Sequence, residues 1–396
     1  MEKGSRPTPA FLGVLAGGFA LYFLMNAVQG KLGSLIFDYG YWWQQIETSA
    51  FYRLLWMIGD ATEPHFHKTL LGGIGVTAGS FLAYYLDKKQ SRWGGTPICY
   101  GTGKWPWVFA ASVLSLGIAI VLFGHLRIED GWVATFIPYV SVAGAIILIY
   151  GGSLTNVLTA AILGAIFTSP ITMFVRAYFC APTGMPGFIG SVTGMWLGGI
   201  IVCELCHMLP WMKVVPGPAP APGANPFPST EYKTKHANKF FIRRLFADYS
   251  EPMFVGNEIA GALLVFGSLL TWFLNPMQPY YGTGWFPALL LCQVITGATA
   301  LYVYWPHWRE SDFFPSFVPI VSVAPGLILV CGPSLFVVIG GAVCGALLTP
   351  PVAIMVNRNI PAHWHPMIGF TFSMALCAIV VTAFFKYLLI AFPALA

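Results

Sequence analysis

The sequence predicts an all-α integral membrane protein of about 11 transmembrane helices: an N-terminal helix followed by two five-helix inverted-topology repeats. Three observations lead to this fold class, namely the composition, the placement of basic residues and a long internal repeat. Of the 396 residues, 57% are hydrophobic and 9% are charged, and the mean hydropathy is +0.70. Soluble domains carry about 25% charged residues, so a water-soluble fold is excluded.

Apolar stretches of about 20 residues, the length that crosses a bilayer, locate the predicted helices. The 43 glycines and 30 prolines fall largely inside these stretches, as in membrane helices whose neighbours satisfy freed backbone groups. The predicted spans lie near residues 10–28, 69–86, 105–124, 132–150, 154–175, 186–210, 254–274, 285–304, 313–331, 335–356 and 366–391.

Basic residues favour one side of the membrane. With the N-terminus in the cytoplasm, the inner loops hold fourteen of the 20 Lys and Arg, the outer loops hold five, and Lys386 lies in the last span. Cytoplasmic loops of membrane proteins are enriched in Lys and Arg. We therefore expect a multi-pass protein of a cell membrane, such as the bacterial inner membrane. Topology accounts for the net charge of +5, so no nucleic-acid partner is expected.

An internal repeat appears when the sequence is compared with itself. The segment Tyr100 to Gly103 recurs at Tyr281 to Gly284, an offset of 181 residues. Residues 136–176 match 317–357 without a gap, with 18 identities in 41 positions. Such similarity indicates duplication. Because each predicted unit contains five helices, the second copy must enter the membrane from the opposite side.

The repeat divides the chain into four predicted regions. Residues 1–68 form the N-terminal transmembrane helix and an acidic outer loop, and 69–210 form the first repeat. Residues 211–252 form a Pro-rich, basic cytoplasmic linker, and 253–396 form the second repeat. Within the linker, the basic stretch 239–246 fits either an anionic inner leaflet or a solvated linker.

Inverted five-helix repeats are a recurrent plan of secondary transporters, in which substrate binds near the midplane at the repeat interface. The predicted function is therefore alternating-access transport of a small molecule or ion, coupled to a proton or another cation. No catalytic triad, phosphate-binding loop or dinucleotide motif is present, so neither an enzyme nor a cofactor is expected. The lipid bilayer is the expected environment, with a homodimer as one expected assembly.

Small and polar residues at equivalent mid-span positions form the predicted substrate site. Gly144 and Pro325 are expected to break two symmetric helices, and the Thr-x-Pro segments at 168–170 and 349–351 to interrupt the helices that follow. A packed, kinked helix pair is the alternative interpretation. The predicted substrate-binding residues are Ser141, Ala143, Gly144, Asn156, Thr168, Ser322, Ala324, Pro325 and Thr349.

Ionisable residues within spans are candidates for ion coupling, because a charge is costly to hold in a membrane. The predicted coupling groups are Glu258 with Asn257, and Glu204 with His207. The alternative is solvation of both acids at the membrane surface.

Two other functions are kept as alternatives: a membrane-embedded redox, metal-binding or haem-binding subunit, and a non-transporting scaffold. The segment from Cys203 to His207 matches the C-x-x-C-H pattern of haem attachment, but it lies in an apolar helix on the predicted inner side. The pairs His65/His67 and His363/His365 have types that bind transition metals. We expect them to be surface histidines.

Overall fold

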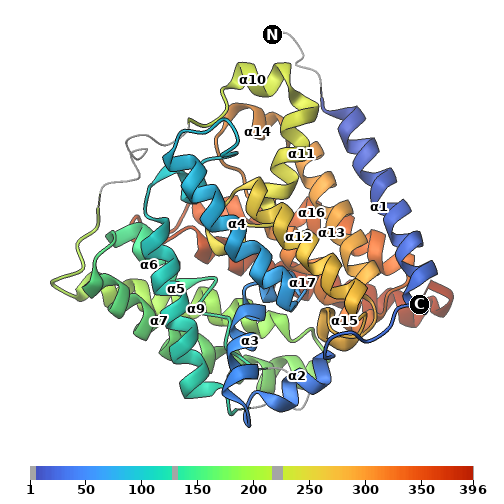
Figure 1. Ribbon diagram of the computed structural model, residues 1–396, viewed down its shortest axis with the longest axis horizontal. Helices are drawn as coiled ribbons and strands as arrows, with labels where there is room; N and C mark the ends of the chain where they lie inside the picture. Colours follow the sequence, from blue (N-terminus) through green and yellow to red (C-terminus); the bar gives the residue numbers. More distant parts are fainter. Residues whose placement is uncertain (1–5, 127–132, 216–225, 396) are drawn as a thin grey trace.

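The computed structural model describes residues 6–126, 133–215 and 226–395, and every regular element among them is a helix (Figure 1). Seven helices are long and apolar enough to cross a membrane. They are α1 (Thr8–Gln29), α5 (Trp105–Phe123), α7 (Leu154–Val175), α9 (Phe188–Met208), α13 (Phe286–Val303), α16 (Leu335–Asn357) and α17 (Met367–Ala391). The all-α membrane class is thus confirmed at this level.

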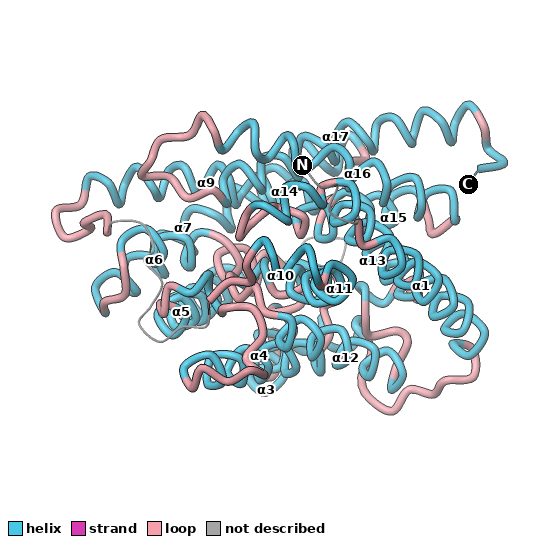
Figure 2. The backbone as a smooth tube through the Cα atoms, turned by 90° about the horizontal axis from the view of Figure 1, so that it is seen from above, coloured by secondary structure: helices cyan, strands magenta, loops and turns pink. Residues whose placement is uncertain are grey.

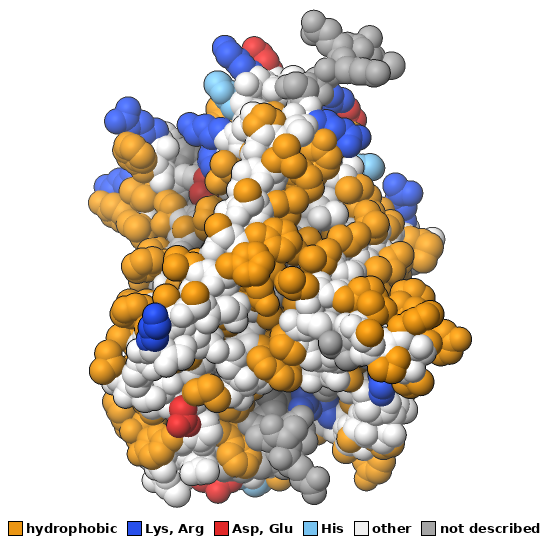
Figure 3. All heavy atoms as spheres, turned by 90° about the vertical axis from the view of Figure 1, so that its right-hand side faces the viewer, with side chains coloured by type: hydrophobic (Ala, Val, Ile, Leu, Met, Phe, Trp, Pro, Cys, Tyr) orange, Lys and Arg blue, Asp and Glu red, His pale blue; other side chains and the backbone are white. Residues whose placement is uncertain are grey.

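The outer surface of these helices is apolar. Val121, Phe174 and Ile390 expose 76%, 63% and 78% of their surface. Figure 3 shows hydrophobic side chains covering the middle of one face, with most Lys and Arg toward one end. In water such an extended apolar surface would drive association, so this surface is consistent with a membrane protein.

Two further helices, α4 (Leu70–Lys88) and α12 (Glu258–Leu274), pack against each other along their lengths. They run antiparallel, because Gly79 faces Ala260 whereas Gly72 faces Gly267. A Cβ at Gly79 would lie 2.8 Å from Ala260 Cα, and one at Gly267 would lie 2.9 Å from Gly72 Cα. Glycine at the crossing therefore lets the two backbones approach, as is typical of helix contacts in membranes.

The same order of elements occurs twice along the chain. The first set is α3 (Ala50–Asp60), η1 (Glu63–His65), α4, η2 (Ile98–Gly101), α5, α6 (Val142–Tyr150), α7 and α9. The second set is α11 (Ala237–Asp248), η4 (Glu251–Met253), α12, η5 (Tyr280–Gly282), α13, α15 (Val323–Cys331), α16 and α17. The helix α1 lies outside both sets and packs along α13.

The helices form two outer layers with irregular chain between them. Figure 2 shows α9, α16 and α17 on one side and α3, α4 and α12 on the other, with loops and other helices between them. The remaining short helices are α2 (Tyr39–Gln45), α8 (Ala181–Thr183), α10 (Thr230–Lys235), α14 (Trp305–Glu310), η3 (Arg176–Cys180), η6 (Val318–Val321) and η7 (Pro393–Leu395). Central loops require buried polar partners, and these form the candidate site.

Two of the predicted spans are not continuous helices. In place of 132–150 and 313–331 the described chain has turns, including η6, followed by α6 and α15, which have nine residues each. Nine residues extend about 13.5 Å, too short for a hydrocarbon core of about 30 Å. Residue 132 lies outside the described residues. Hydropathy alone predicted full spans here because the turns are as apolar as the helices.

The predicted helix breaks also lie elsewhere. Both short helices begin after a serine, Ser141 or Ser322, whose backbone is non-helical, with φ of −138° and −145°. Gly144 and Pro325 occupy the first turn, where proline removes no helical hydrogen bond. The helices α7 and α16 continue through Pro170 and through Pro350 and Pro351, so the predicted interruption of these helices is wrong.

Both long polar segments contain helices. Residues 29–68 contain α2, α3 and η1, and 211–252 contain α10, α11 and part of η4. The basic stretch 239–246 lies within α11, and its Arg244 is buried rather than on a leaflet surface. Most of the Pro-rich run falls in 216–225, outside the described residues.

The close α4–α12 crossing predicts that Gly267→Ala destabilises the protein. The added methyl would press on the backbone at Leu71 and Gly72, and overpacking of this kind costs about 1–3 kcal/mol. Thermal unfolding of the purified protein should show a lower Tm. Gly13→Ala in α1 is the matched control, because nothing lies within 4 Å of its Cβ. Equal Tm values for the two variants would contradict the tight crossing.

Candidate functional site

A short motif, Asp-x-x-Glu-Pro-x-Phe, occurs once in each set of helices. It spans residues 60–66 (DATEPHF) and 248–254 (DYSEPMF), an offset of 188. In each copy the aspartate is the last residue of a helix, the glutamate is the first residue of a 3-10 turn, and the phenylalanine has a left-handed backbone. Each motif connects α3 to α4 or α11 to α12 in the centre of the molecule.

The first motif holds a buried charge cluster. The Lys68 ammonium contacts the Asp60 carboxylate and lies 3.4 Å from Glu63 Oε2. The hydroxyl of Thr135 donates to Asp60 Oδ2 at 2.7 Å. Lys68 also lies over the Trp56 ring, 3.7 Å from its centroid. All three charged side chains are 0–1% exposed, so the cluster is fully enclosed by protein.

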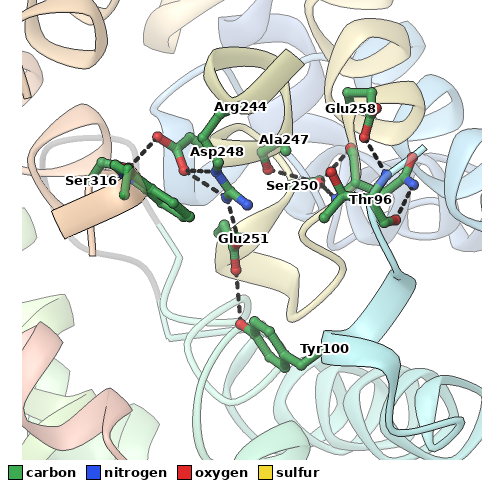
Figure 4. Close-up of polar contacts among 11 residues, drawn as sticks. Thr96, Tyr100, Arg244, Ala247, Asp248, Ser250, Glu251, Glu258 and Ser316 are labelled. Carbon is green, nitrogen blue, oxygen red and sulfur yellow. Dashed lines mark hydrogen bonds and ion pairs between the residues drawn. The ribbon is translucent and has the colours of Figure 1, made fainter. Parts of the chain in front are cut away.

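The second motif builds the corresponding cluster around Arg244. Its guanidinium donates to Asp248 Oδ1 at 2.6 Å and contacts Glu251. The hydroxyl of Ser316 donates to Asp248 Oδ2 at 2.6 Å. Figure 4 shows Arg244 between the two carboxylates, with Ser316 beyond Asp248 and Tyr100 beyond Glu251. Charge-assisted hydrogen bonds of this kind offset the cost of burying the carboxylates.

The two clusters take their cations from different positions of the motif. Lys68 follows its aspartate by eight residues, whereas Arg244 precedes its aspartate by four. At the offset of 188, Gly256 stands where Lys68 would be, and Trp56 stands where Arg244 would be. What the two sites share is therefore the charge balance rather than the identity of the cation.

Tyrosines connect each glutamate to the other set of helices. Tyr100, from the first set, donates to Glu251 Oε2 at 2.9 Å, and Tyr281, from the second set, bonds to Glu63. The two tyrosines are related by the offset of 181. Burial, together with the adjacent carboxylate, raises the pKa of each phenol well above its usual range. Both phenols are therefore protonated donors. Each set of helices thus contributes a tyrosine that bonds to the glutamate of the other set.

Both glutamates and both tyrosines line a cavity of about 420 Å³. Twelve of its 27 lining residues form six pairs at matching positions of the two sets of elements. The matched pairs are Glu63 and Glu251, Pro64 and Pro252, Phe66 and Phe254, Tyr100 and Tyr281, Phe136 and Phe317, and Val140 and Val321. The first turns of α9 and α17 close the cavity with Phe188, Ser191, Met367 and Phe370. Its volume is typical of small-molecule sites.

Backbone strain is concentrated at this cavity. Eight non-glycine residues of the described chain have positive φ, and four of them line the wall: Phe66 (62°), Phe254 (61°), Tyr100 (58°) and Tyr281 (60°). A left-handed backbone costs such residues about 1–3 kcal/mol and is found preferentially at functional sites. This strain supports the cavity as the functional site.

One basic side chain, Arg176, also lines the cavity. It begins the π-helical turn η3, which extends α7 to Thr183. Glycines on α9 leave room for it, because a Cβ at Gly187 or Gly190 would lie 2.5 Å from its side chain. The position at the offset of 181 is Asn357, which is absent from the wall. Arg176 therefore makes the cavity asymmetric.

The sequence-predicted substrate residues lie near the cavity, but none of them lines it. Ser141 and Ser322 donate to the carbonyls of Ile137 at 2.5 Å and Val318 at 2.8 Å. Those carbonyls belong to the turns that precede α6 and α15. The serine hydroxyls therefore supply hydrogen bonds to backbone carbonyls where the chain is not a continuous helix. The residues that do reach the wall, Val140 and Val321, immediately precede the two serines.

The other predicted substrate residues have packing or capping contacts. Asn156 donates to the carbonyls of Tyr150 and Gly151 at the end of α6. Thr168 and Thr349 each donate to a carbonyl four residues earlier in the same helix. The remaining four are buried in the first turns of α6 and α15: Ala143, Gly144, Ala324 and Pro325. Their role in substrate binding remains a prediction.

The predicted coupling residues lie away from the wall. Glu258 pairs with Arg243 at 2.7 Å and accepts from the Thr96 amide, while Asn257 donates to the Gly94 and Thr96 carbonyls. They attach the loop after α4 to the start of α12. Their coupling role remains a prediction.

The second predicted coupling pair lies at the end of α9. Glu204 is 47% exposed and accepts from His363 and Trp364, and His207 stacks on His363 with centroids 4.2 Å apart. Its coupling role likewise remains a prediction.

The histidine pair at 65 and 67 is fully buried, which corrects the expectation of surface histidines. His67 bridges Ser268 and Gln293, each at 2.9 Å. His65 stacks on Tyr249 with an interplanar angle of 15°. Within the described residues, no group of three or more His, Cys, Asp or Glu side chains is arranged to hold a metal ion.

Sequence reasoning missed the acids of the motif, because they were assigned to a polar outer loop and a linker. The ungapped offset of 181 does not align the two motifs, since their own offset of 188 differs by seven residues. The connection from the motif to the Tyr-Gly-Thr-Gly segment is seven residues shorter in the second set. A self-comparison allowing one gap there would have aligned both motifs.

No known protein family matches this sequence, and no curated protein was found to be similar to it.

The reciprocal tyrosine contacts predict that Tyr100→Phe and Tyr281→Phe destabilise the protein similarly. Each change removes one hydrogen bond to a buried carboxylate, which contributes about 1.5–3 kcal/mol. Denaturant unfolding of the purified variants measures this loss. Tyr178→Phe is the matched control, since that side chain is 73% exposed. Losses no larger than the control's would refute the role of the phenol hydroxyls.

Proposed function

We propose that this protein is a secondary transporter that moves a small solute by alternating access, coupled to a proton or another cation, with the central cavity as its solute site. The observation that carries the proposal is the composition of the cavity wall. Six matched pairs of residues from the two sets of helices line it, and each buried glutamate is bonded by a tyrosine of the other set. A cavity lined by both sets in this way changes shape whenever one set of helices moves relative to the other.

Reciprocal contacts support an inverted repeat. Gly79 faces Ala260, and Gly267 faces Gly72. At the offset of 188, Gly79 corresponds to Gly267 and Gly72 to Ala260, so both contacts join the same two equivalent positions. Reciprocity of this kind implies an approximate two-fold axis between α4 and α12. Because the two helices are antiparallel, that axis is perpendicular to them. If α4 and α12 stand across the membrane, the axis lies in the membrane plane, as in inverted-repeat transporters.

The repeat units proposed on this basis begin earlier than 69 and 253. The paired elements start at α3 and α11, so the end of the region treated as a linker belongs to the second unit. Each unit then comprises the buried acid motif, the central helix, and the helices through α9 or α17. The short helices α6 and α15 occupy equivalent places as half-length elements, a recurrent feature of transporter binding sites.

The proposed orientation places the N-terminus in the cytoplasm. Lys68, Arg176 and Arg244 are buried, so they do not report on loop topology. Two of these three were counted among the five outer basic residues, and removing all three leaves the excess on the inner side. Basic residues on that side favour this orientation.

Inverted topology predicts that the loops after α4 and α12 lie on opposite sides of the membrane. Trp93 and Met277 are exposed there, at 70% and 46%. In a background without reactive thiols, Trp93→Cys should react with an impermeant maleimide only from the cytoplasmic side, and Met277→Cys only from the outside. Permeabilised cells give the control for total labelling. Labelling of both from one side would exclude the inverted repeat.

Filling the cavity tests its role in transport. A thermal-shift screen against metabolites and ions identifies a solute, because a ligand at 100 times its Kd stabilises by about 2.7 kcal/mol. Val321→Phe on the cavity wall should then reduce uptake of that solute into proteoliposomes at least about tenfold. Val380→Phe, 54% exposed on α17, is the matched control. Unchanged uptake by monodisperse Val321→Phe protein would place the solute site elsewhere.

A further inference from the structure

We infer that His365 is a specificity-determining residue of the central cavity, and that its Nε2–H group donates a hydrogen bond to a carbonyl or carboxylate oxygen of the solute. This inference rests on the proposed function and names a chemical group of its solute. His365 belongs to the second histidine pair of the sequence and lies on the cavity wall just before α17. A solute in the cavity can therefore contact its ring.

The start of α17 determines which ring nitrogen of His365 carries the proton. The Met367 backbone amide donates to His365 Nδ1 at 3.1 Å, so Nδ1 is an acceptor and carries no proton. Burial lowers the pKa of His365 to about 4, and the positive end of a helix dipole also disfavours an imidazolium. The ring is therefore neutral at neutral pH, and a neutral ring with a bare Nδ1 has its proton on Nε2.

The Nε2–H group of His365 is available to a ligand. Within the part of the chain that the structure describes, His365 makes one side-chain hydrogen bond, the one at Nδ1. The side chain is only partly buried, and Nε2 is not among the fully enclosed nitrogen atoms that lack a partner. Because the ring lies on the cavity wall, a solute oxygen in the cavity can accept this hydrogen bond.

Most hydroxyl groups of the wall are already committed to the protein. Those of Thr283 and Thr371 each donate to a backbone carbonyl at 2.9 Å. Those of Tyr100 and Tyr281 bond to the glutamates of the two motifs. His365 thus adds a donor that the protein does not use itself. A site that hydrogen-bonds its substrate discriminates strongly against an analogue that lacks the bonded group.

Neighbouring contacts hold the His365 ring in place. The adjacent Trp364 donates to Glu204 at the end of α9, at 2.6 Å. On the cavity side the ring packs edge-to-face with Phe254, with centroids 5.6 Å apart and an interplanar angle of 79°. A donor in a fixed position selects for where the solute carries its oxygen as well as for the oxygen itself.

Three probes of matched shape test the inference. Titration calorimetry on the full chain in nanodiscs would use acetophenone, which has a carbonyl oxygen, benzoate, which has a carboxylate, and α-methylstyrene, in which a methylene group replaces the oxygen. Empty nanodiscs supply the blank. We expect at least one oxygen probe to bind at least about tenfold more tightly than α-methylstyrene, and the tighter of the two identifies the kind of oxygen. If neither does so, the inference is overturned and the transport proposal stands.

Two substitutions separate ligand binding by His365 from its contact with the start of α17. His365→Asn keeps an oxygen that can accept the Met367 amide, since Asn is a good helix cap, but it has no atom where Nε2 lies. His365→Gln keeps an amide N–H near the place of Nε2. We expect His365→Asn to lose the preference for the oxygen probe at an unchanged Tm, and His365→Gln to retain part of it. The matched control is His125→Asn, at an exposed position, which should bind as the wild type does.

A purely structural role of His365 predicts the reverse order, with the preference kept in His365→Asn and lost in His365→Gln. Retained preference in folded His365→Asn protein therefore overturns the inference. The wild-type comparison of the three probes stays decisive if both variants fail to fold. The uptake assay on Val321→Phe judges the transport proposal separately, whatever group the solute carries.

Discussion

The burial of four carboxylates in the centre of a membrane protein is the constraint on which the surrounding structure depends. A charge held away from water must be paired and hydrogen-bonded. Each Asp-x-x-Glu-Pro-x-Phe motif meets this need with one cation, one hydroxyl from the turns before a short helix and one phenol from the other half. The short helices α6 and α15 are explained by the same need. The chain at Thr135 and Ser316 leaves helical geometry, and its hydroxyls reach Asp60 and Asp248.

The arrangement of layers follows from this polar centre. The helices α4 and α12 cross closely through glycine on one side, and α9 and α17 meet on the other. The acid motifs, the Tyr-Gly segments and the turns before α6 and α15 lie between these pairs. Irregular chain at such depth is tolerated where protein satisfies it or where it lines a cavity, and both conditions are met here. The cavity is thus a consequence of the same loops that carry the charges.

The composition and the ungapped repeat predicted an all-helical membrane protein, and they placed most helix positions within a few residues. They failed where apolar sequence is not helical. Residues such as Ile137 and Val318 are as hydrophobic as a span, but their carbonyls bond to serine side chains. Hydropathy does not detect hydrogen bonds of this kind between side chains and nearby backbone carbonyls. The candidate site was missed for a different reason. Glu63 looked like a loop residue, and its partner Tyr281 is distant in sequence, so only the folded chain brings them together.

The unequal cations of the two motifs have an energetic consequence for any rocking motion between the halves. A perfectly symmetric duplicated protein would have two end states related by the two-fold axis, and it would occupy these states equally because their free energies are the same. Lys68 offers a compact point charge, whereas Arg244 offers a planar group that contacts both of its carboxylates. Arg176 and His67 likewise differ from the residues at their equivalent positions, which are Asn357 and Val255. In the proposed transport cycle, these differences would give the two end states unequal free energies.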